Sequence, residues 1–269
     1  MGGSTANALI SLGVTLLLAA CRAPGGLPTD RPIEPTVPPV AYAAPTTPTP
    51  ALTDDLILSE TSFTEMGLVW RECQVSQAGY TDWQQAEVCF GRAAPSRSAE
   101  EEARSATRTE RGLRLTVGDD VYEVRDHDVN VVRWSTLTKN GWPARVLLGG
   151  AMVHSPNISL RDISGKIAWE FAGELQKTVV YDGKDVRALY DLDAAYRPYE
   201  IDGKLIFVGE KDGARFLVSD GERIGPEFDE IVVAYCCEPV LYSVRFGGGR
   251  YAFWGTRGDR HYVVELSGG

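Results

Sequence analysis

Charged side chains are absent from the first 20 residues, so no Lys or Arg precedes the apolar run from Ala8 to Ala20. That run is about 13 residues long, whereas a membrane-spanning helix needs about 20 and the apolar core of a secretion signal about 7 to 15. Its length therefore favours a secretion signal over a permanent transmembrane helix.

Several signatures of catalysis and metal binding are also missing. The chain has no Cys-x-x-Cys pair, its three histidines are scattered, and no Gly-x-Ser-x-Gly turn accompanies His154 and Ser155. The first two absences disfavour a zinc site, and the third removes the usual nucleophile motif of an α/β-hydrolase. We therefore expect no metal and no cofactor, and we assign no catalytic residue.

Positive charge is in short supply. The chain has 27 Lys and Arg against 37 Asp and Glu, which gives a formal net charge of −10. Nucleic acid would repel such a chain, so we expect no nucleic-acid partner.

The apolar run ends in Leu18-Ala19-Ala20-Cys21, which resembles the lipobox of bacterial lipoproteins. The resemblance implies that residues 1–20 are a signal peptide, and that Cys21 becomes an acylated first residue anchored to the cell membrane by palmitate-type chains. A plain secretion signal and a buried apolar helix ending in an ordinary cysteine are the alternatives. An anchored protein of this kind would be extracytoplasmic.

Residues 21–52 resemble a tether. Nine of the 15 prolines lie between Arg22 and Leu52, mixed with Thr, Ala and Gly. Such a stretch has too few large apolar side chains to fold and favours extended polyproline II. At about 3.1 Å per residue it could hold a domain up to roughly 90 Å from the membrane.

Residues 53–111 form a mixed segment. The capping-box pattern from Thr81 to Gln84 predicts a short helix reaching Cys89. Ser98 and Glu101 repeat that pattern, but residues 93–111 have almost no apolar face. For them we favour a loop over a solvated helix.

Residues 112–269 show the pattern of strands and tight turns. Leu113, Leu115 and Val117 alternate up to Gly118, and a second strand follows, which predicts a hairpin. Further turns are expected at four Asp-Gly pairs, which begin at Asp182, Asp202, Asp212 and Asp220. A shift of about 38 residues superimposes 163–169 on 201–207, and a truncated third copy begins at Gly249.

The segment Ile201-Asp202-Gly203-Lys204-Leu205-Ile206-Phe207, followed by Asp212-Gly213 and Asp220-Gly221, resembles the repeats of TolB-like propellers. It is also similar to uncharacterised secreted bacterial repeat proteins. The resemblance implies a mainly β fold, either propeller-like or an open stacked array of short antiparallel β-sheets with a period of about 38 residues, preceded by a small mixed N-terminal segment.

With Cys21 lipidated, four cysteines remain for an oxidising compartment. We favour a disulfide between Cys73 and Cys89. The adjacent Cys236 and Cys237 are then either free thiols or a vicinal pair.

Two acidic pairs and the aromatic residues are the remaining candidates for a site. In a strand, Asp126 and Asp128 would share one face, as would Asp191 and Asp193, which could suit Ca²⁺, but solvated faces often carry such pairs. Most of the aromatic residues in or beside the strands should be core, and any left exposed would be a binding platform: Trp134, Trp142, Trp169, Tyr181, Tyr190 and Trp254.

These observations favour a membrane-tethered lipoprotein that acts as a non-catalytic binding or scaffolding module of the cell envelope. The expected partners are the membrane, through Cys21, and an envelope protein or extracellular ligand. A surface hydrolase acting on carbohydrate or peptide is the alternative, because propellers also host enzymes.

The substitution Cys21→Ser should release the protein from the membrane fraction, because it removes the acylated thiol. Fractionation of cells expressing the variant measures this. Continued tight retention of the variant would refute the lipid anchor.

Overall fold

The computed structural model describes residues 57–129, 132–151, 156–233 and 243–269. The chain divides into one unit of residues 1–49 and a second of residues 50–269, and all the described residues belong to the second. Across the described ranges, no helix is long and apolar enough to cross a membrane. The signal, the acylated cysteine and the whole tether inferred from the sequence lie outside these ranges.

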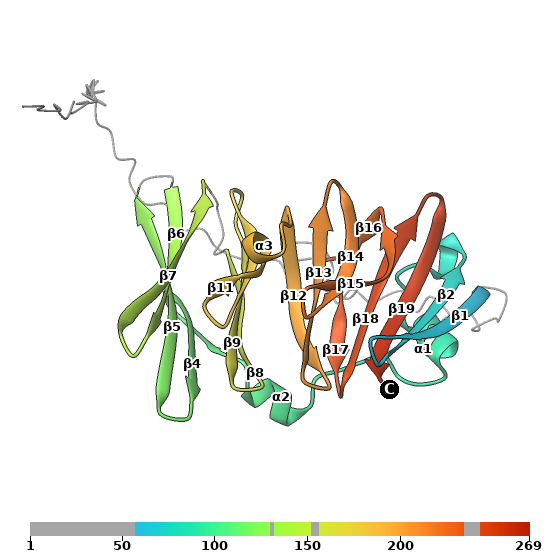
Figure 1. Cartoon of the computed structure of the whole chain (residues 1–269), viewed down its shortest axis with the longest axis horizontal. Helices are drawn as coiled ribbons and strands as arrows, with labels where there is room; N and C mark the ends of the chain where they lie inside the picture. Colours follow the sequence, from blue (N-terminus) through green and yellow to red (C-terminus); the bar gives the residue numbers. More distant parts are fainter. Residues whose placement is uncertain (1–56, 130–131, 152–155, 234–242) are drawn as a thin grey trace, which may run out of the picture. The chain divides into compact units, whose positions relative to one another are not determined.

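The described part is mainly β and contains four separate antiparallel sheets (Figure 1). The first sheet has the order β3-β4-β5-β6-β7, with strands Thr107–Thr109, Gly112–Val117, Asp120–Val129, Val132–Lys139 and Trp142–Gly150. The second has the order β11-β10-β9-β8, with β8 Asn157–Ile163, β9 Lys166–Ala172, β10 Lys177–Tyr181 and β11 Lys184–Asp185.

The third sheet is a four-strand meander in chain order, with β12 Ala194–Ile201, β13 Lys204–Lys211, β14 Ala214–Ser219 and β15 Glu222–Phe228. The fourth has the order β1-β2-β19-β18-β16, and β17 also pairs with β18. Its strands are β1 Ile57–Glu65, β2 Leu68–Val75, β16 Glu230–Ile231, β17 Arg245–Gly247, β18 Arg250–Arg257 and β19 Arg260–Gly268. Short helices complete the described part: α1 Trp83–Phe90, α2 Ala99–Ala103, α3 Val186–Leu189 and the 3-10 turn Gln77–Gly79.

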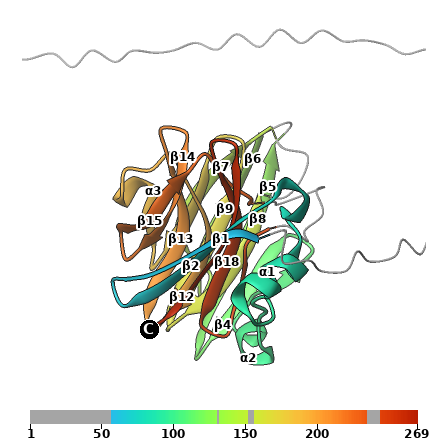
Figure 2. The same cartoon turned by 90° about the vertical axis from the view of Figure 1, so that its right-hand side faces the viewer.

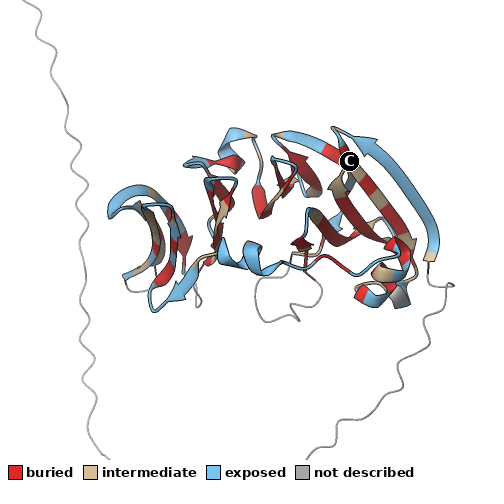
Figure 3. Ribbon diagram, turned by 90° about the horizontal axis from the view of Figure 1, so that it is seen from below, coloured by how far each residue is buried: buried red, intermediate tan, exposed pale blue. Residues whose placement is uncertain are grey.

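Each sheet packs face to face on the next, in the order first, second, third, fourth. Successive side chains of an inner strand point to opposite faces of its sheet, so one strand contacts both neighbouring sheets. In β13, Phe207 packs toward the second sheet and Val208 toward the fourth, since they belong to two different core clusters. In β9, Ala168 faces the third sheet and Trp169 the first. Strands with both faces covered show continuous apolar runs rather than alternation. Figure 3 shows buried residues concentrated in such strands.

The fourth sheet joins the two ends of the described part. Strand β2 pairs with β19 along its whole length, from Leu68 opposite Gly268 to Val75 opposite His261. The mixed N-terminal segment therefore supplies a hairpin, β1 and β2, to the sheet formed by the last strands of the chain.

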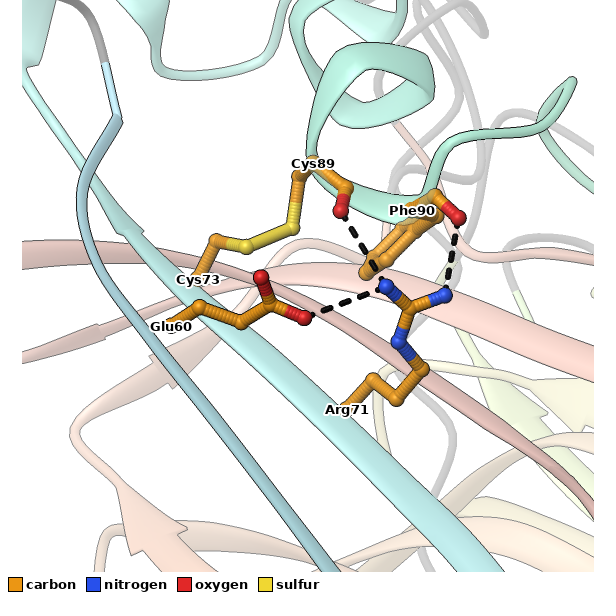
Figure 4. Close-up of a disulfide and its surroundings, with 5 residues drawn as sticks. All are labelled: Glu60, Arg71, Cys73, Cys89 and Phe90. Carbon is orange, nitrogen blue, oxygen red and sulfur yellow. Dashed lines mark hydrogen bonds and ion pairs between the residues drawn. A yellow bond between two sulfur atoms is a disulfide. The ribbon is translucent and has the colours of Figure 1, made fainter.

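Helix α1 covers the outer face of the fourth sheet (Figure 2). Trp83 and Phe90 of α1 pack against Trp254 and Val263 of that sheet. A disulfide joins Cys89 of α1 to Cys73 of β2, which is the pairing favoured by the sequence (Figure 4).

The C-terminal end of α1 is held by an arginine from the sheet. Arg71 donates hydrogen bonds to the carbonyl oxygens of Phe90 (2.8 Å) and Cys89 (3.3 Å), and its guanidinium also contacts Glu60 (Figure 4). A cation at this end satisfies carbonyl groups that the helix leaves unbonded.

Residues 91–106, which we call the strap, connect α1 to the first sheet. They bond to the edge of the second sheet, where Ala106 N donates to Leu160 O (2.8 Å) and Asp162 N donates to Arg104 O (2.9 Å). They also pass very close to the fourth sheet at Gly247, where φ is +149° and an added Cβ would lie 2.0 Å from the Ser96 oxygen. Glycine is required at that crossing.

The predicted hairpin and turns are confirmed. Strands β4 and β5 pair along β4, from Gly112 opposite Arg125 to Val117 opposite Asp120. In all four Asp-Gly turns both residues have positive φ, the backbone of a type I′ turn, which Asp and Gly tolerate.

Three local expectations are wrong. Residues 99–103 form a helix rather than a loop, with the capping box of Ser98 and Glu101 in place and all of its residues outside the core. Residues 107–109 form β3, and the N-cap of α1 is Asp82 rather than Thr81. The absence of an apolar face misled the prediction, because α2 is stabilised by its cap and by the Arg104–Glu100 pair.

Replacing both bridged cysteines (Cys73→Ala with Cys89→Ala) should lower the free energy of unfolding by about 3 kcal/mol, because the bridge closes a loop of 16 residues. Urea unfolding with intrinsic fluorescence measures this. The matched control is Val88→Ala, on the exposed side of α1, which should change stability by less than about 0.5 kcal/mol. Equal stabilities for the double variant and the parent would contradict the structural role of the bridge.

Candidate functional site

A cavity of about 230 Å³ lies where the strap crosses the edges of the second, third and fourth sheets. We call it the strap pocket. Its lining comes from the strap, from β8 and β12, and from β17 and the turn after it: Arg97, Glu101, Arg104, Arg161, Asp162, Ile163, Pro198, Tyr199, Glu200, Phe246 and Gly249.

Glu101 ties the strap to two sheets. Its carboxylate accepts hydrogen bonds from Tyr199 Oη on β12, from Gly248 N (3.0 Å) and from Ser98 N (2.7 Å). Partial desolvation alone would raise the pKa of Glu101, but these hydrogen bonds outweigh it and hold the pKa below the usual glutamate value. Glu101 is therefore ionised at neutral pH and engaged on both oxygens.

Arg161, on β8, also lines the strap pocket. Its guanidinium carbon lies 4.4 Å from the centre of the Phe246 ring, and its Nε is buried without a hydrogen-bond partner. Desolvation lowers the pKa of Arg161 to about 10; Glu170 opposes this shift, and nearby Arg97 and Arg197 add to it. The group remains a cation at neutral pH.

Stacked aromatic rings support the Arg161 side of the pocket. Phe246 stacks on Tyr199 with ring centres 5.0 Å apart, and on the fully buried Tyr251 at 6.1 Å. Tyr251 Oη donates to the Arg197 carbonyl oxygen (2.9 Å). Burial raises the pKa of Tyr199, and its hydrogen bond to Glu101 adds to the shift. Burial also raises the pKa of Tyr251. Tyr199 and Tyr251 are therefore neutral and donate hydrogen bonds.

The first sheet offers a surface of a different kind. Its inner face carries the buried Ser135 and Leu137, so the alternate residues of β6 and their cross-strand neighbours form its outer face. Trp134 lies opposite Leu148 on β7, and Thr136 lies opposite Val146. Val146 and Leu148 are 54% and 50% exposed. With the exposed Val129 and Val132, they form what we call the end face.

The pair Asp126 and Asp128 lies on β5, as its strand pattern predicted, beside a larger polar hollow of about 670 Å³. Each carboxylate already has protein partners. Asp126 accepts from Ser135 Oγ (2.8 Å) and from the buried Asn157, and Asp128 pairs with Arg133 (2.6 Å). His127, between them, contacts Thr136 Oγ1 (2.8 Å) and stacks on Trp134.

Asp191 and Asp193 do not lie in a strand. They fall between α3 and β12, where Asp191 pairs with Lys211 (3.1 Å) and Asp193 accepts from Asp212 N (2.7 Å). Both carboxylates thus hold the β12–β13 region together. No group of three or more potential metal ligands occurs among the residues that the structure describes.

The expectation of buried aromatic residues holds for Trp169 and Trp254, which are fully buried. Trp142 is the one left exposed, at 79%, because it starts the edge strand β7 next to a tight turn. Trp134, Tyr181 and Tyr190 are partly buried. Cys21, His154, Cys236 and Cys237 lie outside the described residues.

Sequence reasoning missed the strap pocket. The capping box marked Glu101, but no local pattern marked Arg161, Tyr199 or Phe246, which come from three sheets. Strand β12 has an irregular backbone beside the pocket, with a positive φ at Arg197 and a shift of register between Tyr196 and Tyr199. Neither feature can be read from the sequence.

Comparison with protein-family models and with curated proteins finds no match. Among solved structures, a hypothetical protein from Leishmania major is similar over 78% of this chain and 83% of its own, at 9% identity and a TM-score of 0.21. A score this low supports no inference about fold or function.

The substitution Glu101→Gln should destabilise the protein at neutral pH by about 1 kcal/mol, since it keeps the helix cap but removes charge-assisted hydrogen bonds at a partly exposed site. Because the folded pKa of Glu101 is lowered, its stabilising effect is present above the unfolded pKa of about 4.3 and is lost as the pH falls through the folded value. Thermal unfolding of parent and variant between pH 7 and pH 3 measures the difference, which should shrink below about pH 4.

The matched control is Glu100→Gln on the same helix, where the carboxylate is exposed and contacts only Arg104 among the described residues. It should cost no more than about 0.5 kcal/mol. A Glu101→Gln effect that does not depend on pH would contradict the role of the ionised carboxylate.

Proposed function

We propose that this chain is a lipid-anchored, extracytoplasmic binding module of the cell envelope that docks a partner protein through its end face and catalyses no reaction. The lipobox-like Leu18-Ala19-Ala20-Cys21 and the proline-rich tether support the location. The Cys73–Cys89 disulfide supports it too, because disulfides persist in oxidising compartments.

The end face is the observation that carries this proposal. The outer face of the fourth sheet is covered by α1, whereas the end face presents Val129, Val132, Val146 and Leu148 to solvent. In stacked arrays the terminal unit usually has a polar outer face, which keeps the protein soluble. The β4–β5 part of this outer face carries the Arg114–Glu123 and Arg125–Glu123 ion pairs, so the apolar part around β6 and β7 is what favours an interaction surface.

The extent of this surface favours a protein partner, although His127, Val129 and Trp134 also line the hollow of about 670 Å³. The whole outer face of the five-stranded sheet, with strands about 4.8 Å apart and a rise of about 3.3 Å per residue, measures roughly 600 Å², and the end face is the part of it around β6, β7 and the end of β5. Each partner contributes about 800 Å² to a standard protein–protein interface, whereas small ligands prefer concave pockets. The partly buried Trp134 beside His127 would supply an aromatic anchor.

We further propose that the sheets are the blades of an open, propeller-like array. Strand β9 starts at Lys166 and β13 at Lys204, and the turns that follow β10 and β14 begin at Asp182 and Asp220. Both separations match the 38-residue offset found in the sequence. An open array leaves one end for a partner, and the end face would take that role.

The site chemistry favours binding over the alternative of a surface hydrolase. A glycosidase uses a carboxyl group whose pKa is raised so that it can act as a general acid. Glu101 shows the opposite shift, and so does the exposed Asp120, whose pKa is lowered chiefly by the hydrogen bond from Lys139.

The double substitution Val146→Glu with Leu148→Glu should abolish docking, because it places two charges in the apolar part of the end face. Crosslinking in the native host, purification of the whole chain and mass spectrometry should show a dominant envelope protein reduced at least about tenfold for this variant. The control is Leu189→Glu, an equally exposed leucine on α3, which should leave capture unchanged. Equal capture by the parent and both variants would refute docking through the end face.

A further inference from the structure

The strap pocket contains one cation, Arg161, that makes no hydrogen bond or ion pair with another described residue, although Glu170 and Glu102 lie near enough to favour its charge. Every other ionised side chain in its lining has a hydrogen bond or ion pair with this chain. Arg97 pairs with Glu102 (2.9 Å), and Arg104 pairs with Glu100 (2.8 Å). These arginines are therefore already neutralised locally.

The acidic side chains of the lining are also engaged. Glu101 accepts hydrogen bonds from Tyr199, Gly248 and Ser98, Asp162 accepts from Gly165 N (2.7 Å), and Glu200 accepts from Ser164 Oγ. None of these carboxylates pairs with Arg161 in the described part of the chain.

Arg161 is the exception. No hydrogen bond or ion pair joins its guanidinium to another described residue, and its Nε is buried. We infer that the strap pocket binds the anionic group of a small ligand, a carboxylate or a phosphate, with Arg161 as the anchoring cation. The strap pocket is separate from the end face, so anion binding does not depend on the proposed docking there.

The geometry of Arg161 suits such a ligand. A guanidinium presents its N–H donors in a planar fork that matches two oxygens of a carboxylate or phosphate. Stacking on Phe246 fixes the plane and occupies a face of the fork, which leaves its edge for hydrogen bonds. Tyr199 Oη and Arg97 border the same cavity.

The charges around Arg161 are mixed: Glu170 and Glu102 favour its charge, whereas Arg97 and Arg197 disfavour it. A bound anion would relieve the repulsion from the two arginines. The effect is local, because the chain as a whole carries a net charge of −10.

Size and lining restrict the ligand class. A cavity of about 230 Å³ is smaller than the roughly 300–1,000 Å³ of pockets that enclose whole drug-sized ligands, so it fits a small free anion or the anionic end of a larger molecule. The carboxylates of Glu101, Asp162 and Glu200 around it would repel a polyanion such as nucleic acid.

The test measures thermal unfolding of the whole chain, purified in detergent, in inorganic phosphate and in acetate, each compared with chloride at equal ionic strength. We expect a saturable rise in Tm of about 2–4 °C with at least one of the two anions. A rise with acetate alone indicates a carboxylate ligand, and a rise with phosphate alone a phosphate ligand. No saturable rise with either anion would overturn the inference.

Two substitutions identify the anchor. Arg161→Gln should remove the anion-dependent rise, and Arg161→Lys, which keeps the charge but not the fork, should weaken the apparent affinity about tenfold or more. The matched control is Arg125→Gln, an exposed arginine on the first sheet, which should keep the full rise. If Arg161→Gln does not fold, Arg161→Lys decides. A rise that persists with unchanged affinity in the Arg161 variants would overturn the assignment.

Discussion

The pairing of β2 with β19 is the constraint on which the rest of the described structure depends. It brings residues 68–75 against residues 261–268, so the chain begins and ends in the same sheet. Because the intervening chain must leave that sheet and return to it, the first, second and third sheets are laid down in order between the two ends. A long-range ladder of this kind forms only after a large loss of chain entropy, which continuous burial on both faces of the inner strands offsets.

The strap is a consequence of that pairing. After β2 and α1 the chain lies at the fourth sheet, and its next strand belongs to the first sheet at the other end of the stack. The connection runs along strand edges and bonds to β8 and to the turn after β17. Covered edges are less available for unwanted strand pairing. The strap pocket lies where this connection crosses the edges of three sheets.

The two ends of the stack are finished differently. At the fourth sheet, α1 supplies Trp83 and Phe90 as an apolar cover, and a disulfide and Arg71 hold it in place. At the first sheet the end face has no such cover among the described residues. An array of stacked sheets must cover its last apolar face or use it, and this asymmetry is the physical basis for placing docking at the end face.

Local chemistry was readable from the sequence. Asp-Gly turns, the β4–β5 hairpin and the capping box of Ser98 depend on residues close together in the chain, so their patterns predict them directly. The Cys73–Cys89 pairing was also favoured, because few partners were available. Which aromatic residue stays exposed was not readable, since alternation along β7 does not show that Trp142 starts a strand at a sheet edge.

Tertiary structure alone decided which sheets stack, that β2 completes the last sheet, and that Arg161, Tyr199 and Phe246 share one pocket. These residues come from three different sheets, and their meeting depends on the path of the strap rather than on any neighbour in the sequence. The sequence by itself determined the turns, the apolar strands and the signal-like N-terminus, because those rest on backbone preference and hydrophobic pattern. Contacts between distant segments arise from the balance of burial and chain entropy over the whole fold, and local patterns do not carry that information.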